Sequence, residues 1–258
     1  SSYVLISIGR DRRALTAAYQ YLIMGTIGAT FILIGIGLLC AMTGTLNMGD
    51  LAARIPAVAH TRTVHAAFAF LAIGVSLKLA LFPLHLWLPN AYAYAPSAVT
   101  AFLAATATKV AVYVLLRFFF TVFGAPFSFG TMRLDIVLLP LALAGIFSAS
   151  VAAIFQADVK RMLAYSSVAQ VGYMILGISL VSVTGLTAGI SHLFNHALMK
   201  GALFMALGCV SFRVGAAKLE RMAGVGRTMP WTMGAFVIGG LSLIGVPLTA
   251  GFVSKWYL

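Results

Sequence analysis

Uncharged apolar runs of about 20 residues or more recur along the whole 258-residue chain, and this feature constrains the fold most. At a rise of about 1.5 Å per residue, a helical run of this length crosses a hydrocarbon core about 30 Å thick. Charged residues make up only 9% of the chain, whereas a soluble domain carries about a quarter. The sequence therefore predicts an all-α, polytopic transmembrane helical bundle. We expect the tail of one span at residues 1–9 and further spans at 16–42, 63–88, 97–122, 133–155, 163–183, 186–211 and 230–258.

The formal net charge of +12 comes from Lys and Arg residues scattered over short loops. Proteins that bind nucleic acid gather such residues into a basic patch or stripe, so we expect no nucleic-acid partner. Basic loops instead orient a multi-pass protein, with their excess on the cytoplasmic side of a cell membrane, in a bacterium the inner membrane. Alternation of the spans places Arg10, Arg12, Arg13, Lys160, Arg161, Arg213, Lys218, Arg221 and Arg227 on the cytoplasmic face, and Arg54, Arg62, Arg117 and Arg133 on the other.

The two cysteines and the chain ends indicate no specific chemistry. Cys40 and Cys209 lie in different apolar runs, with no spacing typical of a disulfide framework or a metal site. The chain begins without an initiator Met and ends at Leu258 inside an apolar run. We therefore expect a single transmembrane domain over residues 1–258 that forms the central piece of a longer protein.

Two spans carry a proline deep inside: Pro83 in SLKLALFPLHLWLP and Pro247 in IGVPLTAGFVSK. Such a proline removes a backbone hydrogen bond and clashes with the preceding turn, so each span should break there. A harmless kink is the alternative, since membrane helices tolerate proline. Lys78 and Lys255 accompany the two breaks, however, and a broken helix with a nearby lysine in each half favours inverted repeats. We place the end of the first repeat at about 1–123 and most of the second at about 133–258.

Four lysines fall at the depth of the membrane: Lys78, Lys109, Lys200 and Lys255. A charged lysine at the centre of a spanning helix costs about 2.5 to 3.5 kcal/mol unless it is paired, hydrated or neutral. Snorkelling to the interface could relieve Lys255 if the last helix is short. It cannot relieve Lys109 or Lys200, which lie about a dozen residues from either end of their spans.

A histidine pair extends this buried polar set. His192, His196 and Lys200 are four residues apart, so they share one face of a helix. A lone buried histidine is usually structural, but two in register with a lysine favour a function. All carboxylates fall in loops or at span ends, so the lysines either find partners outside this chain or spend time neutral. We hypothesise a lateral, water-bridged proton relay through Lys109, His192, His196, Lys200 and Lys255.

Four segments carry a resemblance to a known family: SLKLALFPLHLWLPNAYAYAPSAVTAFLAATATKVAVYVLLRF, ADVKRMLAYSSVAQVGYMILG, HLFNHALMKGALF and GVPLTAGFVSKWYL. In this order, and over essentially the whole chain, they resemble the proton-conducting antiporter-like subunits of respiratory complex I and of the Mrp-type multisubunit cation/proton antiporters. SSYVLISIG, the GTLNMGDLA loop and GFVSKWYL are most similar to the Mrp D-type subunit, with the quinone-reductase subunits next.

The resemblance implies a fourteen-helix subunit with two inverted five-helix repeats, of which this chain would run from the end of the fifth helix into the twelfth. A fifth-helix glutamate of the family, which pairs with the seventh-helix lysine, would lie just upstream of Ser1. No cofactor is expected, because quinone, flavin and iron–sulfur chemistry belongs to other subunits. By this resemblance, Lys78 corresponds to the lysine of the broken seventh helix, and Lys109 corresponds to the bridging lysine of the eighth helix. The polar face of the eleventh helix comprises His192, His196 and Lys200. Lys255 corresponds to the terminal Lys or Glu of the broken twelfth helix.

The leading hypothesis is a proton-translocating subunit of a multisubunit monovalent cation/proton antiporter, in which protonation of Lys78 is coupled through Lys109 to release near Lys255. The alternative within the family is a proton-pumping subunit of a complex I type NADH:quinone oxidoreductase or a related membrane-bound hydrogenase. Expected partners are other membrane subunits, protons, Na⁺ or K⁺, and the lipid bilayer. No catalytic residue or metal ligand is assigned.

Two further hypotheses come from other classes. A membrane scaffold would use buried polar groups to join helices, although Ser, Thr and Asn would do so at lower cost than lysine. A solute carrier would bind its substrate at the broken helices. We rank the carrier last, because the buried polar residues are more typical of a proton path than of a ligand site.

Overall fold

The computed structural model describes residues 2–9, 11–215 and 217–258. Apart from an isolated bridge between Asp158 and Lys218, these residues form helices and their connections, which confirms the all-α prediction for the described part of the chain. The α-helices are α1 (Ser2–Ser7), α2 (Arg12–Thr43), α3 (Met48–Val58), α4 (Arg62–Leu79), α5 (Trp87–Tyr94), α6 (Ser97–Leu116), α7 (Leu134–Ile154), α8 (Val159–Ser179), α9 (Val183–Val214), α10 (Val225–Thr228), α11 (Pro230–Ile244) and α12 (Ala250–Trp256). Three short elements of π- or 3₁₀-helix are η1 (Arg117–Val122), η2 (Pro126–Thr131) and η3 (Leu219–Met222).

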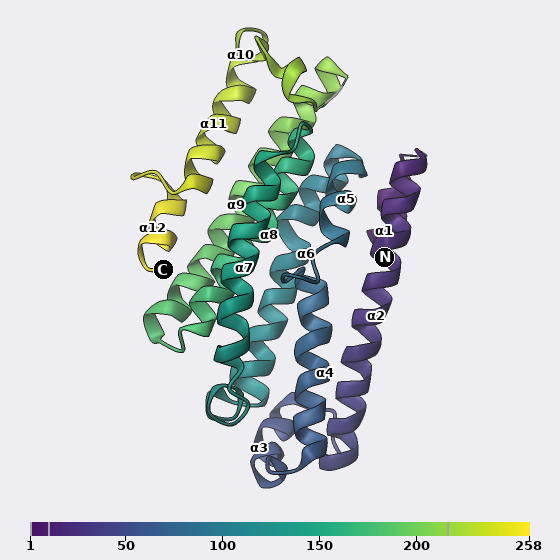
Figure 1. The fold of residues 1–258 in the computed structure, drawn as a ribbon, viewed down its shortest axis with the longest axis vertical. Helices are drawn as coiled ribbons and strands as arrows, with labels where there is room; N and C mark the ends of the chain where they lie inside the picture. The colour runs from purple at the N-terminus through teal and green to yellow at the C-terminus, as the bar shows by residue number, and fades with distance from the viewer. Residues whose placement is uncertain (1, 10, 216) are drawn as a thin grey trace.

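Six helical segments of the described chain are long and apolar enough to cross a membrane. They are α2, α4, α6 continued by η1, α7, α8 and α9. Figure 1 shows them side by side as a bundle. The polytopic prediction is therefore confirmed.

The helix α3 is a difference from the sequence prediction, which includes no helix between residues 43 and 62. The side-chain oxygen of Asn47 accepts hydrogen bonds from the backbone N–H groups of Gly49 at 2.8 Å and Asp50 at 3.4 Å. This is an ordinary N-cap. Leu51 and Ile55, one turn apart, are buried on the inner face. The segment is thus an amphipathic helix, but its 11 residues are too few to span a membrane.

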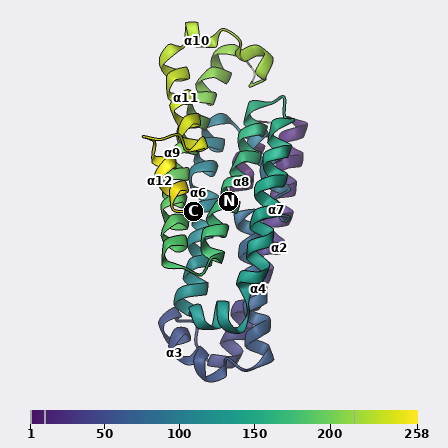
Figure 2. The ribbon, with the colours of Figure 1, turned by 60° about the vertical axis from the view of Figure 1, so that its left-hand side comes forward.

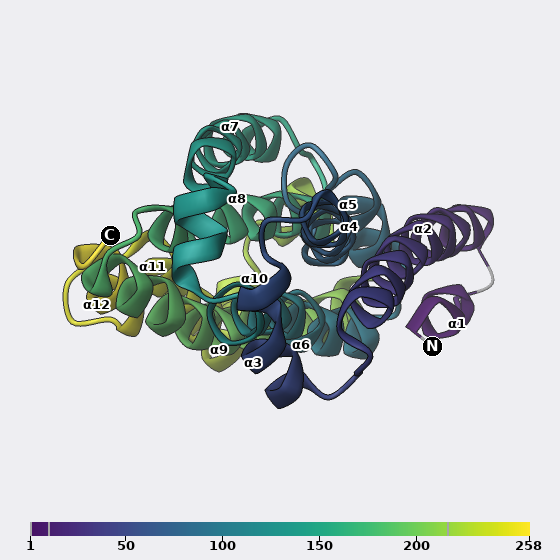
Figure 3. The ribbon, with the colours of Figure 1, turned by 90° about the horizontal axis from the view of Figure 1, so that it is seen from below.

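Seen along the helix axes in Figure 3, α6 and α9 lie side by side, and α8 lies between α9 and α7. The helices α1 and α2 lie beyond α4, whereas α11 and α12 pack against α9 at the opposite side of the bundle (Figure 2). Because α9 contacts α6, α8, α11 and α12, it can bring together polar groups from four neighbouring helices.

Glycines let two pairs of helices approach closely. A Cβ added to Gly74 of α4 would lie 2.8 Å from the carbonyl oxygen of Gly28 on α2. A Cβ added to Gly177 of α8 would lie 2.6 Å from the carbonyl oxygen of Gly185 on α9. Small residues at such contacts are typical of membrane bundles, where close packing rather than exclusion of water holds helices together.

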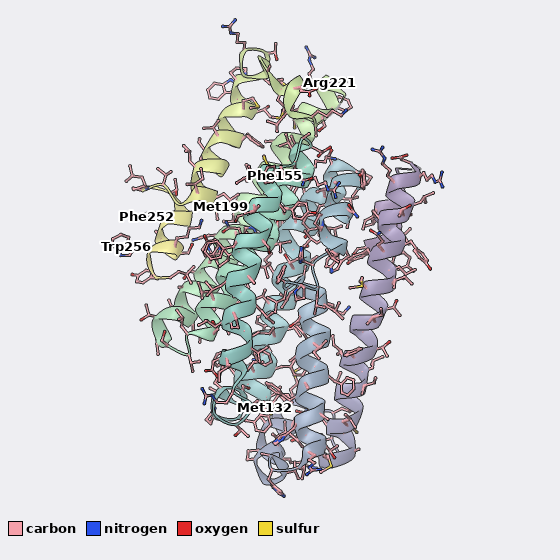
Figure 4. All side chains as sticks on the ribbon, in the orientation of Figure 1. Met132, Phe155, Met199, Arg221, Phe252 and Trp256 are labelled. Atoms are coloured by element: carbon pink, nitrogen blue, oxygen red, sulfur yellow. The ribbon has the colours of Figure 1, made fainter. Side chains whose placement is uncertain are left out.

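Chain direction alternates between helices, so the basic loops fall at two ends of the bundle. Figure 4 labels Arg221 at the α10 end and Met132 at the α3 end. Arg10 lies outside the described residues. The positive-inside rule predicts that the α10 end is cytoplasmic, because it has the larger basic group. That end carries Arg12, Arg13, Lys160, Arg161, Arg213, Lys218, Arg221 and Arg227, and the α3 end carries Arg54, Arg62, Arg117 and Arg133.

Two helices are interrupted near the prolines singled out in the sequence. The segment between α4 and α5 contains Pro83, and the segment between α11 and α12 contains Pro247. In Figure 1, α4 runs away from the α3 end, whereas α11 runs away from the α10 end. The two broken helices therefore cross the bundle in opposite directions, as halves of inverted topology would.

Candidate functional site

Five of the six predicted relay side chains gather around α9. His192, His196 and Lys200 line one face of α9 and have no exposed surface. Lys109 of α6 is 5% exposed, and Lys255 of α12 is partly buried. The helices α6 and α12, which carry Lys109 and Lys255, both pack against α9. We call these five residues the relay cluster.

His192 is held by polar side chains from two neighbouring helices. Its Nε2 lies 2.7 Å from Oε1 of Gln170 on α8, and its Nδ1 lies 2.9 Å from Oγ of Ser254 on α12. Because Gln170 presents its oxygen, Nε2 carries a hydrogen and donates it, so the neutral ring accepts at Nδ1. His192 therefore joins α8, α9 and α12 through hydrogen bonds.

His196 continues the same face one turn later. Its ring is nearly parallel to that of His192, with the ring centroids 6.0 Å apart and an interplanar angle of 6°. Both ring nitrogens are buried, and neither forms a hydrogen bond with the described residues. A neutral imidazole has one donor and one acceptor nitrogen, so His196 presents both to the bundle interior at this point of α9.

Lys200 and Lys109 are held by neutral oxygens. Nζ of Lys200 donates to the carbonyl oxygen of Leu163 at 2.7 Å and to the hydroxyl of Ser166, both on α8. Nζ of Lys109 donates to the carbonyl oxygen of Ala104 and lies 3.4 Å from Oγ1 of Thr108. Each amine thus has a local acceptor deep in the bundle without an ion pair.

Lys255 uses carbonyl groups that the helix break releases. Its Nζ donates to the carbonyl oxygens of Leu243 at 2.9 Å and Ile244 at 3.2 Å, in the last turn of α11. The last carbonyls of a helix lack partners within that helix, and its C-terminus carries partial negative charge. The amine also lies 4.8 Å from the ring centroid of Tyr173, which adds a cation–π contact. The end of α11 therefore takes the place of a carboxylate.

No carboxylate takes part in the relay cluster. Among the residues that the structure describes, the only ion pair joins Arg133 and Asp135 at 3.6 Å, at the α3 end. Residues 2–9, 11–215 and 217–258 also contain no group of three or more His, Cys, Asp or Glu side chains arranged to hold a metal ion. Neutral acceptors let a lysine gain or lose its proton without leaving a buried carboxylate unpaired.

Lys78 lies outside the relay cluster. It is exposed near the end of α4, where it lines a cavity of about 200 Å³ between α2, α4 and α6. The helix α6 presents Val110 and Ala111 to this cavity, whereas Lys109 is buried in the bundle. Lys109 is therefore not among the α6 residues that line the cavity with Lys78.

The sequence analysis missed the partners of the cluster on α8. Ser166, Gln170 and Tyr173 are spaced four and three residues apart, so they lie on one helical face, opposite the polar face of α9. This spacing is visible in the sequence and could have predicted a polar face on α8. Another missed residue is His85, which is buried between α4 and α5 and stacks on Phe82, with their ring centroids 5.4 Å apart.

Comparison with known proteins identifies the family. The family described as NADH:quinone oxidoreductase/Mrp antiporter, TM, matches residues 1–258. The chain belongs to this family. Its membership explains why one sequence carries motifs of both quinone reductases and antiporters.

Relatives from both branches of the family match the chain along its length. NADH-quinone oxidoreductase subunit N of Desulforudis audaxviator is 48% identical over 100% of this chain and 51% of its own length. The D-type subunit of the Na⁺/H⁺ antiporter of Alkalihalophilus pseudofirmus is 31% identical over 100% of this chain and 52% of its own length. The chain spans about half the length of the curated relatives it matches. These two identities do not favour the antiporter branch, which the motifs had ranked first.

Two solved structures share the fold closely. The membrane-bound sulfane sulfur reductase, an archaeal respiratory membrane complex, contains a chain that is 36% identical, with a TM-score of 0.90 over 99% of this chain and 52% of that chain. The Mrp complex from Dietzia sp. DQ12-45-1b contains one that is 33% identical, with a TM-score of 0.90 over 100% of this chain and 47% of that chain. The equal TM-scores do not discriminate between a respiratory membrane complex and an Mrp complex.

Proposed function

We propose that this chain is part of a proton-translocating membrane subunit and that its relay cluster carries protons between α6 and α12. The observation that carries the proposal is the burial of two histidines and two lysines beside a partly buried third lysine, with neutral hydrogen-bond acceptors for all three amines. A histidine can pass a proton between its two ring nitrogens, and a buried lysine gives up its proton more readily than one in water. A cluster of these groups can therefore accept a proton at one point and release it at another.

Lys78 has a separate role in this proposal. The adjoining cavity suits a site that takes up a proton before the relay cluster does. Because Lys109 does not line the same cavity, we propose that a charge on Lys78 acts on Lys109 electrostatically rather than by direct transfer. Release then follows near Lys255.

The partners follow from the relatives. The relatives in the Na⁺/H⁺ antiporter and in the NADH-quinone oxidoreductase are both subunits by name. We propose that the full protein assembles with other membrane subunits in a cell membrane and exchanges protons for Na⁺ or K⁺.

A redox-driven complex is the second candidate. The 48% identity with an NADH-quinone oxidoreductase subunit N, against 31% with the antiporter subunit, favours it. In such a complex, other subunits would carry the redox chemistry, and the relay cluster would keep the same task.

The test uses everted membrane vesicles from cells that carry the full-length gene with its neighbouring genes. A preset pH gradient is followed after addition of Na⁺ or K⁺, in wild type and Lys78→Ala, with Lys218→Ala as the matched control on an exposed loop. Cation-dependent collapse that an assembled Lys78→Ala complex loses supports the antiporter. If only a respiratory electron donor builds a gradient, and the variant cannot build it, the redox-driven complex is correct.

The same vesicles test the scaffold hypothesis. A scaffold with a substituted Lys78 or Lys109 would lose assembly, whereas a conductor would assemble and lose transport. Transport at the wild-type rate by a fully assembled Lys109→Ala complex would contradict the proposed function.

A further inference from the structure

Ser254 lies where one hydroxyl faces two acceptors. It is fully buried on α12, with Oγ 2.9 Å from Nδ1 of His192 and 3.2 Å from the carbonyl oxygen of Gly251. A hydroxyl has a single hydrogen to donate, although it can accept as well. Ser254 can therefore donate to His192 or to Gly251, but not to both at full strength.

The charge of His192 decides between these two bonds. Its Nε2 is already committed as a donor to Gln170. When the ring is neutral, Nδ1 has a free lone pair, and Ser254 donates to it. When Nδ1 binds a proton it becomes a donor, so Ser254 accepts from it and turns its own hydrogen to the Gly251 carbonyl.

The bond from Ser254 to Gly251 acts on the helix that carries Lys255. A serine hydroxyl that bonds to a carbonyl of the preceding turn competes with the helical backbone and tends to bend the helix. This turn is packed tightly, because a Cβ on Gly251 would lie only 1.8 Å from the carbonyl oxygen of Ser242 on α11. A bend there has no free space to relax into and shifts the next residue, Lys255, relative to the end of α11.

We propose that Ser254 is a positioning residue that couples the protonation of His192 to the contact between Lys255 and the last carbonyls of α11. The inference rests on the proposed relay function and deepens it. Protonation of His192 would shift the position of the Lys255 side chain before a proton is transferred to Lys255. Gln170 serves the same coupling, because it fixes which nitrogen of His192 faces Ser254.

The titratable groups around His192 do not bypass this coupling. On α9 it faces His196, on α8 the ring of Tyr173, on α12 Lys255 and on α6 Lys109. The sequence of α11 (Pro230–Ile244) contains no titratable side chain. Of the hydrogen bonds between described residues, only that with Ser254 involves Nδ1 of His192.

The experiment measures the pH profile of proton flux by the full-length subunit in its complex, in everted vesicles. Ser254→Ala removes the hydroxyl, Ser254→Thr keeps it, and Ser254→Cys keeps the size with a much weaker hydrogen bond. Ser179→Ala is the matched control, because Ser179 is also buried and bonds to the carbonyl oxygen three residues earlier, on α8, without a histidine partner.

We expect Ser254→Ala and Ser254→Cys to lower flux roughly tenfold and to move the pH profile toward lower pH, because the protonated ring loses a charge-assisted hydrogen bond. Ser254→Thr and Ser179→Ala should keep the wild-type profile. A loss by the same factor at every pH would reduce Ser254 to a structural role and overturn the coupling. If Ser254→Ala fails to assemble, Ser254→Cys decides the matter.

A further variant separates failure of the coupling from failure of the proposed function. His192→Gln keeps a polar side chain that does not titrate. Wild-type flux in His192→Gln would overturn the relay itself. Lost flux in His192→Gln together with a wild-type pH profile in Ser254→Ala would overturn only the coupling.

Discussion

The two broken helices each carry a lysine, and the two lysines have opposite surroundings. Lys255 is partly buried, and its amine bonds to Leu243 and Ile244 across the break between α11 and α12. Lys78, the second-last residue of α4, instead lines a cavity beside the break between α4 and α5. The same sequence pattern, a lysine near a proline-interrupted helix, therefore leads to two different sites.

The side-chain donors at the end of each first half-helix differ. Backbone N–H groups bond to the fourth-last carbonyl in the same way at the ends of α4 and α11. At the end of α4, the indole N–H of Trp87 adds a bond to the carbonyl oxygen of Leu77 at 3.0 Å. At the end of α11, the amine of Lys255 instead bonds to the last two carbonyls, where the helix terminus carries partial negative charge.

The largest effect is expected inside the relay cluster. Lys200→Met should lower proton flux at least about 100-fold, because a positioned proton carrier is removed. Thermal stability of the complex should stay the same or rise, since an apolar side chain of similar volume replaces a buried amine. Vesicle assays and thermal unfolding of the purified complex measure the two quantities, with Lys218→Met on the exposed loop as the control. Flux near wild type in an assembled Lys200→Met complex would place the proton path elsewhere.

A large loss of stability is expected where the halves of the second break meet. Gly251→Ala should destabilise the protein by about 3 kcal/mol or more, because the new Cβ would lie 1.8 Å from the carbonyl oxygen of Ser242. Gly240→Ala on α11 is the control, since nothing lies within 4 Å of its added Cβ. Chemical unfolding and the yield of assembled complex measure the effect. Equal stability of the two variants would show that the break is not tightly packed.

The two lysine sites should differ in their tolerance of arginine. Lys200→Arg should cost about 1 to 3 kcal/mol of stability, because the larger group must fit a site with no exposed surface. Lys78→Arg should stay within about 0.5 kcal/mol, because Lys78 lines a cavity. Unfolding midpoints of the two variants measure this contrast. Similar unfolding midpoints for Lys200→Arg and Lys78→Arg would show that the two lysine sites do not differ in enclosure.

The smallest effect tests the neutral donor at the first break. Trp87→Phe keeps an aromatic ring but leaves the carbonyl oxygen of Leu77 without its indole donor. We expect a loss of about 1 kcal/mol in stability. Trp231→Phe is the matched control, because that side chain is 91% exposed. A change no larger than in Trp231→Phe would mean that the indole bond does not matter at the end of α4.

Local patterns in the sequence account for much of the fold and part of the site. Apolar runs predict the spans, and the spacing of His192, His196 and Lys200 predicts their common face, because helical geometry alone determines both. The helix α3 was not predicted, since its Asn47 cap and buried Leu51 give only a weak signal between two strong spans.

Contacts between distant residues could not be predicted. Gln170 and Ser254 lie 22 and 62 residues from His192, and nothing in the local sequence pairs them. Which residues of α6 share a cavity with Lys78 likewise depends on how whole helices pack. The positions of the lysines in the sequence therefore predict how deep each lies in the membrane, but not which lysines lie next to one another.

The alignment of three titratable groups along α9 has a consequence for the membrane potential. His192 and Lys200 are eight residues apart on one helix, which is about 12 Å along its axis and roughly 40% of a hydrocarbon core about 30 Å thick. One elementary charge that crosses the whole membrane does work of about 2.3 kcal/mol per 100 mV, so a step along α9 would account for about 0.9 kcal/mol. A proton transfer parallel to the membrane plane, from α6 toward α12, would involve almost no electrical work. Voltage would therefore act on the α9 part of the path and leave the lateral part unaffected.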